Sequence, residues 1–265
     1  MTEQLLAGRE ARPVPGIDNG FIGGYRVRFD EAGPDGRLRT AGLLRYAQDI
    51  AWRHSEAIGF DRRWYDEQGF SWVVRAVDLV VTAAIPIGAT VRVETAVIGH
   101  RRAWARRRGE FKMPDGASAA VILTDWLLVD RRGRIVRIPP VFGSVFANPE
   151  ATFELTRVAP PPPPTHAARL AIRVRPADLD PMGHVNNAVY LDWLDEAITT
   201  AGDTGATTAV PHEIRLEYAA SAEAGDVLEA VSWRDRGGWW LRLRRSSDDA
   251  ESARAWLGPP DPAHD

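Results

Sequence analysis

The densest group of chemically capable side chains in this chain lies between residues 178 and 190. Asp180 stands in a segment with Pro and Gly that favours a tight turn, and His184, Asn186 and Asn187 follow it closely. A carboxylate in such a place can serve as a general base or as a nucleophile. Asp, Asn, Pro and Gly are also the residues that turns and helix caps select, so a purely structural role is the alternative.

A helix is expected directly after this group, with Asn187 as its cap. Apolar residues recur there at helical spacing, at Val189, Tyr190, Trp193, Leu194, Ala197 and Ile198. The free N–H groups in the first turn of a helix, together with the helix dipole, favour negative charge in front of them. We therefore predict that this helix end stabilises an oxyanion beside Asp180.

The elements around this group follow from changes in the apolar period. A helix of about five turns is predicted after Thr40, because apolar residues recur at helical spacing as far as Ile58. Beyond each helix the period falls to two, as in 91–97 and 214–218, which is typical of strands. One long helix followed by antiparallel strands in each half predicts an α+β fold, with a sheet wrapped around a single helix.

The two halves also resemble each other. At an offset of 147 residues, Pro34, Gly36, Leu44 and Asp49 match Pro181, Gly183, Leu191 and Glu196, and the strand segments match at an offset of 137. Five consecutive prolines in between cannot continue a helix or a sheet ladder. The order of matches predicts an internal duplication, with an N-terminal domain over 19–156, a linker over 157–166, a C-terminal domain over 167–258, and loose ends at 1–18 and 259–265.

Composition excludes several classes of protein. The chain has 265 residues, a net charge of -3 and no cysteine, so thiolate metal sites and a Cys nucleophile are ruled out and nucleic-acid binding is disfavoured. Neither a membrane-spanning segment nor a secretory signal fits the sequence, and a cytoplasmic location is expected. Sequence motifs for serine hydrolases, phosphate loops and zinc helices are missing, so no cofactor or metal is expected.

The segment from Asp180 to Tyr190 resembles the active-site segment of hot-dog thioesterases. Together with residues 27–52, it makes most of the chain similar to the acyl-acyl-carrier-protein thioesterase family. The resemblance implies two fused hot-dog domains, with the catalytic acid at Asp180, a histidine at His184 and polar helix-end positions at Asn186 and Asn187. It also implies hydrolysis of a fatty acyl thioester of acyl-carrier protein or coenzyme A, while further dimerisation of the tandem unit is compatible with the sequence but not demanded by it.

The sequence departs from the plant-like pattern of that family at two places. Met182 stands where those members have Asn, and Ser221 and Ala222 align with their Glu and Cys. The motif Asp180, Pro181 and Gly183 also resembles that of hydroxybenzoyl-coenzyme A thioesterases. With the partner residues missing, the resemblance implies a mechanism that depends on Asp180 alone.

Several further residues are candidates for the site. Gly33 and Arg37 occupy the positions of Asp180 and His184 in the first copy, which predicts one working site per chain. Glu196 is a reserve catalytic carboxylate. Gly183, Tyr190 and Trp193 are expected to bind substrate. A basic group could dock the acidic carrier protein or the phosphates of coenzyme A, although a charged edge strand is the alternative; it consists of Arg101, Arg102, Arg106, Arg107 and Arg108.

Two other functions remain open at this stage. A hot-dog hydratase or dehydratase acting on acyl thioesters is the nearest enzymatic alternative, although the spacing of Asp180 and His184 differs from the hydratase pattern. A non-catalytic acyl-binding module is the alternative from a different class, because the expected partners are replaced at Met182 and Ser221.

Overall fold

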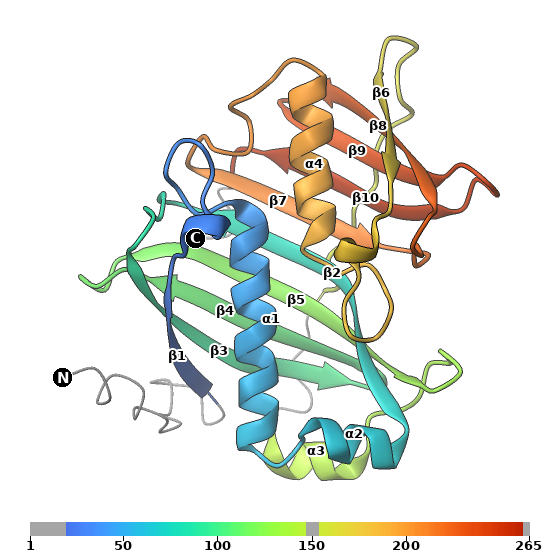
Figure 1. The fold of residues 1–265 in the computed structure, drawn as a ribbon. Coiled ribbons are helices and arrows are strands. Elements are labelled where there is room, and N and C mark those ends of the chain that lie inside the picture. The colour runs from blue at the N-terminus through green and yellow to red at the C-terminus, as the bar shows by residue number, and fades with distance from the viewer. Residues whose placement is uncertain (1–19, 147–153, 262–265) are drawn as a thin grey trace.

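The computed structural model describes residues 20–146 and 154–261 and contains two repeats that share one ten-stranded antiparallel sheet (Figure 1). The strand order is β1-β3-β4-β5-β2-β7-β10-β9-β8-β6. The first repeat consists of β1 (Gly20–Arg26), η1 (Phe29–Glu31), α1 (Thr40–Ala57), α2 (Arg62–Gln68), β2 (Phe70–Val81), β3 (Thr90–Arg101), β4 (Trp104–Lys112), β5 (Ser118–Asp130) and α3 (Pro140–Val145). The second consists of β6 (Ala168–Arg173), η2 (Pro176–Asp178), α4 (Val189–Thr200), β7 (His212–Tyr218), β8 (Val227–Asp235), β9 (Gly238–Arg245) and β10 (Glu251–Gly258).

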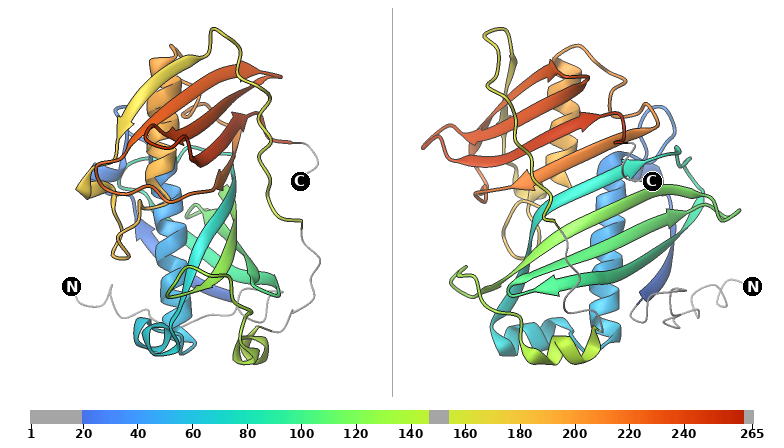
Figure 2. Two further views of the ribbon diagram at one scale, coloured as in Figure 1. Left: turned by 90° about the vertical axis from the view of Figure 1, so that its right-hand side faces the viewer. Right: turned by 180° about the vertical axis from the view of Figure 1, so that it is seen from behind.

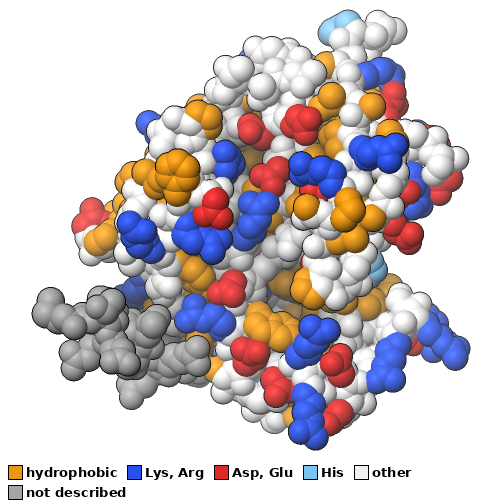
Figure 3. Space-filling view, in the orientation of Figure 1, with side chains coloured by type: hydrophobic (Ala, Val, Ile, Leu, Met, Phe, Trp, Pro, Cys, Tyr) orange, Lys and Arg blue, Asp and Glu red, His pale blue; other side chains and the backbone are white. Residues whose placement is uncertain are grey.

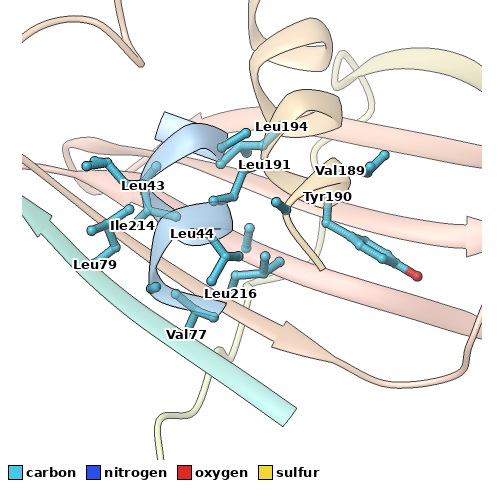
Figure 4. Packing of buried hydrophobic residues seen from close by; sticks show 14 of the residues in the cluster. Leu43, Leu44, Val77, Leu79, Val189, Tyr190, Leu191, Leu194, Ile214 and Leu216 are labelled. Carbon is cyan, nitrogen blue, oxygen red and sulfur yellow. The ribbon is translucent and has the colours of Figure 1, made fainter. Parts of the chain in front are cut away.

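The long helices α1 and α4 lie on the same face of this sheet (Figures 1 and 2). Each has one apolar stripe, and that stripe packs on the sheet and on the other helix, as Figure 4 shows for Leu44 and Leu191. Leu44 is fully buried, so its truncation to alanine is expected to cost about 2–5 kcal/mol of folding free energy. The predicted α+β architecture, with one long helix against the sheet in each half, is confirmed.

The duplication predicted from the sequence appears as a pseudo-twofold relationship. The two halves of the sheet have the same internal order of strands, and they join where β2 pairs with β7. Asp78 and Arg215, which match each other at the offset of 137, are direct partners in that pairing. The pseudo-twofold axis therefore passes through this pair of strands.

The turns that precede α1 and α4 contain equivalent backbone hydrogen bonds at the offset of 147. The N–H of Gly33 donates to the carbonyl of Arg37 at 2.8 Å, and the N–H of Asp180 donates to the carbonyl of His184 at 2.7 Å. Gly183 closes its turn with a φ of 80°, a region that favours glycine. The same backbone thus carries a carboxylate in one repeat and a glycine in the other.

Three features differ from the expectations. The short helices α2 and α3 were not predicted, and they lie near the end of α1 (Figure 1). The predicted linker is held to the sheet at its start, where Val158 is buried and its N–H donates to Glu217. The predicted tail is held at Asp261, whose N–H donates to Glu213. The predicted N-terminal segment 1–18 and residues 262–265 lie outside the described residues.

Candidate active site

Two cavities lie at pseudo-symmetric positions between the repeats. The larger has a volume of about 680 Å³ and lies between the turn at Asp180 and the face of α1 that carries Gln48 and Trp52. The smaller has a volume of about 280 Å³ and lies between the turn at Gly33 and α4. Each cavity therefore combines the turn of one repeat with the helix of the other.

Asp180 lines the larger cavity and is half-buried. Its Oδ1 accepts the N–H of Met182 at 2.8 Å and that of His184 at 3.2 Å. Its Oδ2 has no hydrogen-bond donor within residues 20–146 and 154–261. The turn thus fixes one carboxylate oxygen and leaves the other available to a water molecule or a substrate.

Asn186 and Asn187 line the same cavity and connect it to the first repeat. The side-chain amide of Asn187 donates to Oε1 of Gln48 at 2.9 Å, and the Asn187 carbonyl accepts the hydroxyl of Tyr218 at 2.9 Å. No acceptor in the described part of the chain takes the N–H of Asn187. This backbone group is therefore available as an oxyanion donor.

The prediction that Asn187 caps α4 was wrong. The capping residue is Ala188, which makes no side-chain hydrogen bond, and it is Asn186 whose Oδ1 accepts the N–H of Ala188 at 2.9 Å. The cap is displaced by one residue because Asn187 is held by Gln48 and Tyr218 instead.

The wall of the larger cavity comes almost entirely from the first repeat. Apart from residues 180–182, Asn186 and Asn187, every lining residue belongs to α1, α2, the strands of the first half or α3 and its flanks. The wall is mainly apolar and aromatic, and its apolar members are Ala51, Trp52, Phe70, Trp72, Val97, Ala105, Trp126, Ile138, Phe142 and Phe146. Such a lining suits a hydrocarbon chain.

A polar group interrupts this apolar wall. Arg107 reaches the cavity from β4, and its Nη1 donates to Nδ1 of His54 at 2.9 Å and to the hydroxyl of Thr95 at 3.3 Å. Burial, and then the neighbouring guanidinium of Arg107, lower the pKa of His54 to about 3, while burial lowers the pKa of Arg107 to about 10. At neutral pH the pair therefore carries a single positive charge, on Arg107.

Several predicted site residues lie elsewhere. The side chain of His184 is exposed and does not line the cavity; only its backbone contacts Asp180. Gly183 serves the turn and is also absent from the lining. Tyr190 and Trp193 are core residues, 4% and 3% exposed, with their ring centroids 4.9 Å apart. Neither side chain lines either of the two cavities, because both pack in the core beneath α4.

The reserve carboxylate Glu196 is exposed and lines neither cavity. Its counterpart at the offset of 147 is Asp49, and that residue lines the larger cavity from α1. Asp49 accepts a hydrogen bond of 2.5 Å from the hydroxyl of Tyr25. The prediction chose the helix of the same repeat, whereas the structure places the other helix opposite Asp180.

The five arginines do not form one basic surface. Arg106 is buried and holds the carboxylate of Asp125 through two hydrogen bonds of 2.6 and 2.7 Å. Arg107 faces the cavity, and Arg108 pairs with Glu110 at 2.9 Å. Only Arg101 and Arg102 are fully exposed. On the face that carries the helices, positive and negative side chains alternate (Figure 3).

Sequence reasoning missed the contribution of the first repeat to the larger cavity. Gln48, Trp52 and Ser55 repeat at helical spacing on a face of α1 beside its apolar stripe. Trp52 on this face is not a sufficient signal, because a single exposed apolar side chain is ordinary on a protein surface and only a larger patch marks a binding site.

The smaller cavity lacks the corresponding carboxylate. Gly33 occupies the position equivalent to Asp180 in the other repeat. Asp192 and Asp195 of α4 occupy the positions equivalent to Arg45 and Gln48, which line the larger cavity. The two cavities thus differ in charge as well as in size.

No helix among the described residues is both long and apolar enough to cross a membrane. Within 20–146 and 154–261, no cluster of three or more His, Asp or Glu side chains could hold a metal ion.

Comparisons with known proteins connect the two repeats to described domains. Residues 18–145 match the model of the acyl-ACP thioesterase N-terminal domain, and residues 163–254 match that of the acyl-ACP thioesterase C-terminal domain. A comparison with curated protein sequences found no relative.

Solved structures with the same fold cover nearly the whole chain. The 12:0-ACP thioesterase from Umbellularia californica is 20% identical, covers 91% of this chain and 96% of its own, and has a TM-score of 0.76. A protein from Lactobacillus plantarum described as an oleoyl thioesterase is 21% identical, with coverages of 91% and 97% and a TM-score of 0.75. An acyl-ACP thioesterase from Bacteroides thetaiotaomicron is 15% identical, with coverages of 90% and 97% and a TM-score of 0.75. The tandem hot-dog fold is therefore established, and with two domain models matched in order, the chain belongs to the acyl-ACP thioesterase family.

Proposed function

We propose that this protein hydrolyses fatty acyl thioesters of acyl-carrier protein or coenzyme A to the free acid and the carrier thiol, with Asp180 as base or nucleophile. The observation that carries the proposal is the position of Asp180 at a cavity of about 680 Å³ with apolar walls. The cavity would hold the acyl chain within the first repeat and present its thioester to the turn of the second.

The chemistry follows from the two carboxylate oxygens of Asp180. In the base route, Oδ2 accepts a proton from water while the water oxygen attacks the thioester carbonyl, and the N–H of Asn187 donates to the developing oxyanion. The carbon–sulfur bond then breaks, and the proton held by Asp180 passes to the leaving thiolate. In the nucleophile route, Oδ2 attacks the carbonyl, the carbon–sulfur bond breaks and the carrier leaves as a thiolate. Water then hydrolyses the acyl–Asp180 anhydride, which releases the fatty acid, restores the carboxylate and supplies the proton for the thiolate.

The positions of Asn186 and Asn187 support this assignment. Gln48 of α1 holds the side-chain amide of Asn187 at 2.9 Å, and Tyr218 holds its carbonyl. These two bonds hold Asn187, whose own N–H has no acceptor in the described residues. A pre-positioned donor of this kind is worth about 3 kcal/mol of transition-state stabilisation.

A hydratase is less well supported, because the ring of His184 is exposed and lies outside the cavity lining. The relatives of known structure are described as a 12:0-ACP thioesterase and an oleoyl thioesterase, which favours fatty acyl chains on a carrier protein. Arg101 and Arg102, both exposed on the turn between β3 and β4, are the remaining candidates for carrier docking.

The test is release of free thiol from acyl-ACP and acyl-coenzyme A by the wild type and by Asp180→Asn. We expect the variant to lose about 10²- to 10⁴-fold in kcat while its melting temperature changes little. Retained activity contradicts the role of Asp180, and residual activity near one half would reveal a second working site at the smaller cavity. An enoyl hydration assay run in parallel distinguishes the hydratase, and acyl binding without turnover identifies a binding module.

A further inference from the structure

We propose that the far end of the larger cavity binds a carboxylate at the distal end of the acyl chain, so that monothioesters of dicarboxylic acids are its preferred substrates. This inference rests on the proposed thioesterase function. The structural basis is the cation of Arg107 inside a cavity whose wall is otherwise mainly apolar and aromatic.

The free edge of Arg107 has the geometry that a carboxylate needs. Its Nη1 is occupied by His54 and Thr95, while Nε and Nη2 have no acceptor within the described residues. The preceding residue, Arg106, uses these same two nitrogens to hold both oxygens of Asp125 at 2.6 and 2.7 Å. Arg107 therefore presents to the cavity the fork that binds carboxylates through two parallel hydrogen bonds.

The charge of Arg107 is not neutralised by the acids that line the cavity. Asp49 accepts from Tyr25, Asp66 pairs with Arg62, and Asp180 is held by backbone N–H groups. His54 is neutral at physiological pH. Because a cation enclosed without a counterion is costly, an acyl chain that brings its own anion would gain more from this site than one that ends in a methyl group.

A second polar group lies near the first. His100 lines the cavity, and its buried Nε2 has no hydrogen-bond partner in the described residues. On the neighbouring strand it pairs with Ala105, which is two residues before Arg107 and also lines the cavity. His100 thus lines the wall beside Arg107, with its unpartnered Nε2 turned away from the open space of the cavity.

The distance between the two ends of the cavity sets the length of the chain. Gln48 contacts Asn187 beside the turn of Asp180, and His54, six residues further along α1, contacts Arg107. Six residues of helix correspond to about 9 Å. The extended diacyl chains from adipoyl to sebacoyl have end-to-end lengths close to this distance, and suberoyl is the middle member of that series.

The experiment compares suberoyl-coenzyme A with octanoyl-coenzyme A, which differ only in the distal group. We expect kcat/KM of the wild type to be at least about tenfold higher for the suberoyl thioester, because a charge-assisted, two-bond contact is worth about 10- to 100-fold. Arg107→Met is expected to lower kcat/KM for the suberoyl thioester much more than for the octanoyl thioester, and so to remove this preference. Arg108→Met, the same change one position along β4 and outside the cavity, should leave the preference intact.

Octanoyl hydrolysis equal to or faster than suberoyl hydrolysis by the wild type would overturn the proposal. An equal loss of kcat/KM for both thioesters in Arg107→Met would also overturn it, since Arg107 would then contact the carrier and not the distal end of the acyl chain. If Arg107→Met does not fold, Arg107→Lys, which keeps the charge but loses the fork, is expected to retain only part of the preference. Calorimetric binding of both thioesters to Asp180→Asn separates the two proposals: tighter suberoyl binding supports this inference even if no hydrolysis is found, and equal binding refutes it.

Discussion

Arg45 of α1 and Asp192 of α4 form an ion pair, with Nη2 and Oδ2 2.6 Å apart, although they are 147 residues apart in the chain. They occupy equivalent positions of the two repeats, so the pair lies where the pseudo-twofold axis passes between the helices. Arg45 also lines the larger cavity and Asp192 the smaller one. This ion pair thus links the two helices and places a cation at the larger cavity and an anion at the smaller one.

Exchange of these two charges tests how much the pair contributes to the packing of the repeats. Both side chains are partly exposed, at 40% and 36%, so we expect Arg45→Asp or Asp192→Arg alone to lower the free energy of unfolding by about 1 kcal/mol. The double exchange should recover most of that loss. Denaturant unfolding of the four proteins provides the measurement, and a double variant as unstable as the sum of the single variants would show that the pair has no coupling energy.

Gln48 is expected to position Asn187 for catalysis. Gln48→Ala removes the acceptor of the Asn187 amide, and we expect kcat to fall about tenfold with little change in melting temperature. Asp195 occupies the equivalent position on α4 and lines the smaller cavity, so Asp195→Ala is a matched control that should leave kcat unchanged. Equal effects of the two substitutions would argue against a specific role for the larger cavity.

The volume near Ala105 is expected to limit the acyl chain. Ala105 lines the larger cavity on β4, opposite His100 and Trp126 on the neighbouring strands. Ala105→Phe would fill part of the space, so kcat/KM for long chains should fall at least about tenfold relative to short chains. Trp126→Ala enlarges the same region and should shift the preference in the opposite direction. A uniform loss over all chain lengths in both variants would place the chain elsewhere.

His54 is expected to make stability depend on pH. Burial lowers its pKa in the folded protein from 6.5 to about 3, so only the unfolded chain takes up a proton as the pH falls below 6.5. Protonation therefore favours unfolding in this range. The stabilisation by neutral His54 is complete above pH 6.5 and declines by up to about 1.4 kcal/mol per pH unit towards pH 3.

Unfolding free energies measured between neutral and mildly acidic pH check this expectation. His54→Asn keeps an acceptor for Arg107 but cannot titrate, so its stability should decline less steeply with acid than that of the wild type. His166 is exposed, and His166→Asn should retain the steep decline. Equal slopes for all three proteins would show that His54 is not the titrating group.

Local pattern determined much of the fold from the sequence. The apolar period predicted α1, α4 and the alternation of the strands, because each depends only on which side chains need burial. Matching turns at Gly36 and Gly183 predicted the duplication. Asp180 stood out as a carboxylate in a turn with Pro and Gly, and its resemblance to the active-site segment of hot-dog thioesterases made it the catalytic candidate. These features are set by neighbours in the sequence and need no knowledge of distant contacts.

Only the tertiary structure decided which groups share the site. Pairing of β2 with β7 places the turn of Asp180 opposite α1, so the helix carboxylate at the cavity is Asp49 and not Glu196. Along β4, Arg106 and Arg107 point to opposite sides of the sheet. The sequence predicts that successive side chains of β4 alternate between the two faces of the sheet. It does not predict which of these faces carries the helices, because that depends on how the strands of both repeats pack over α1 and α4.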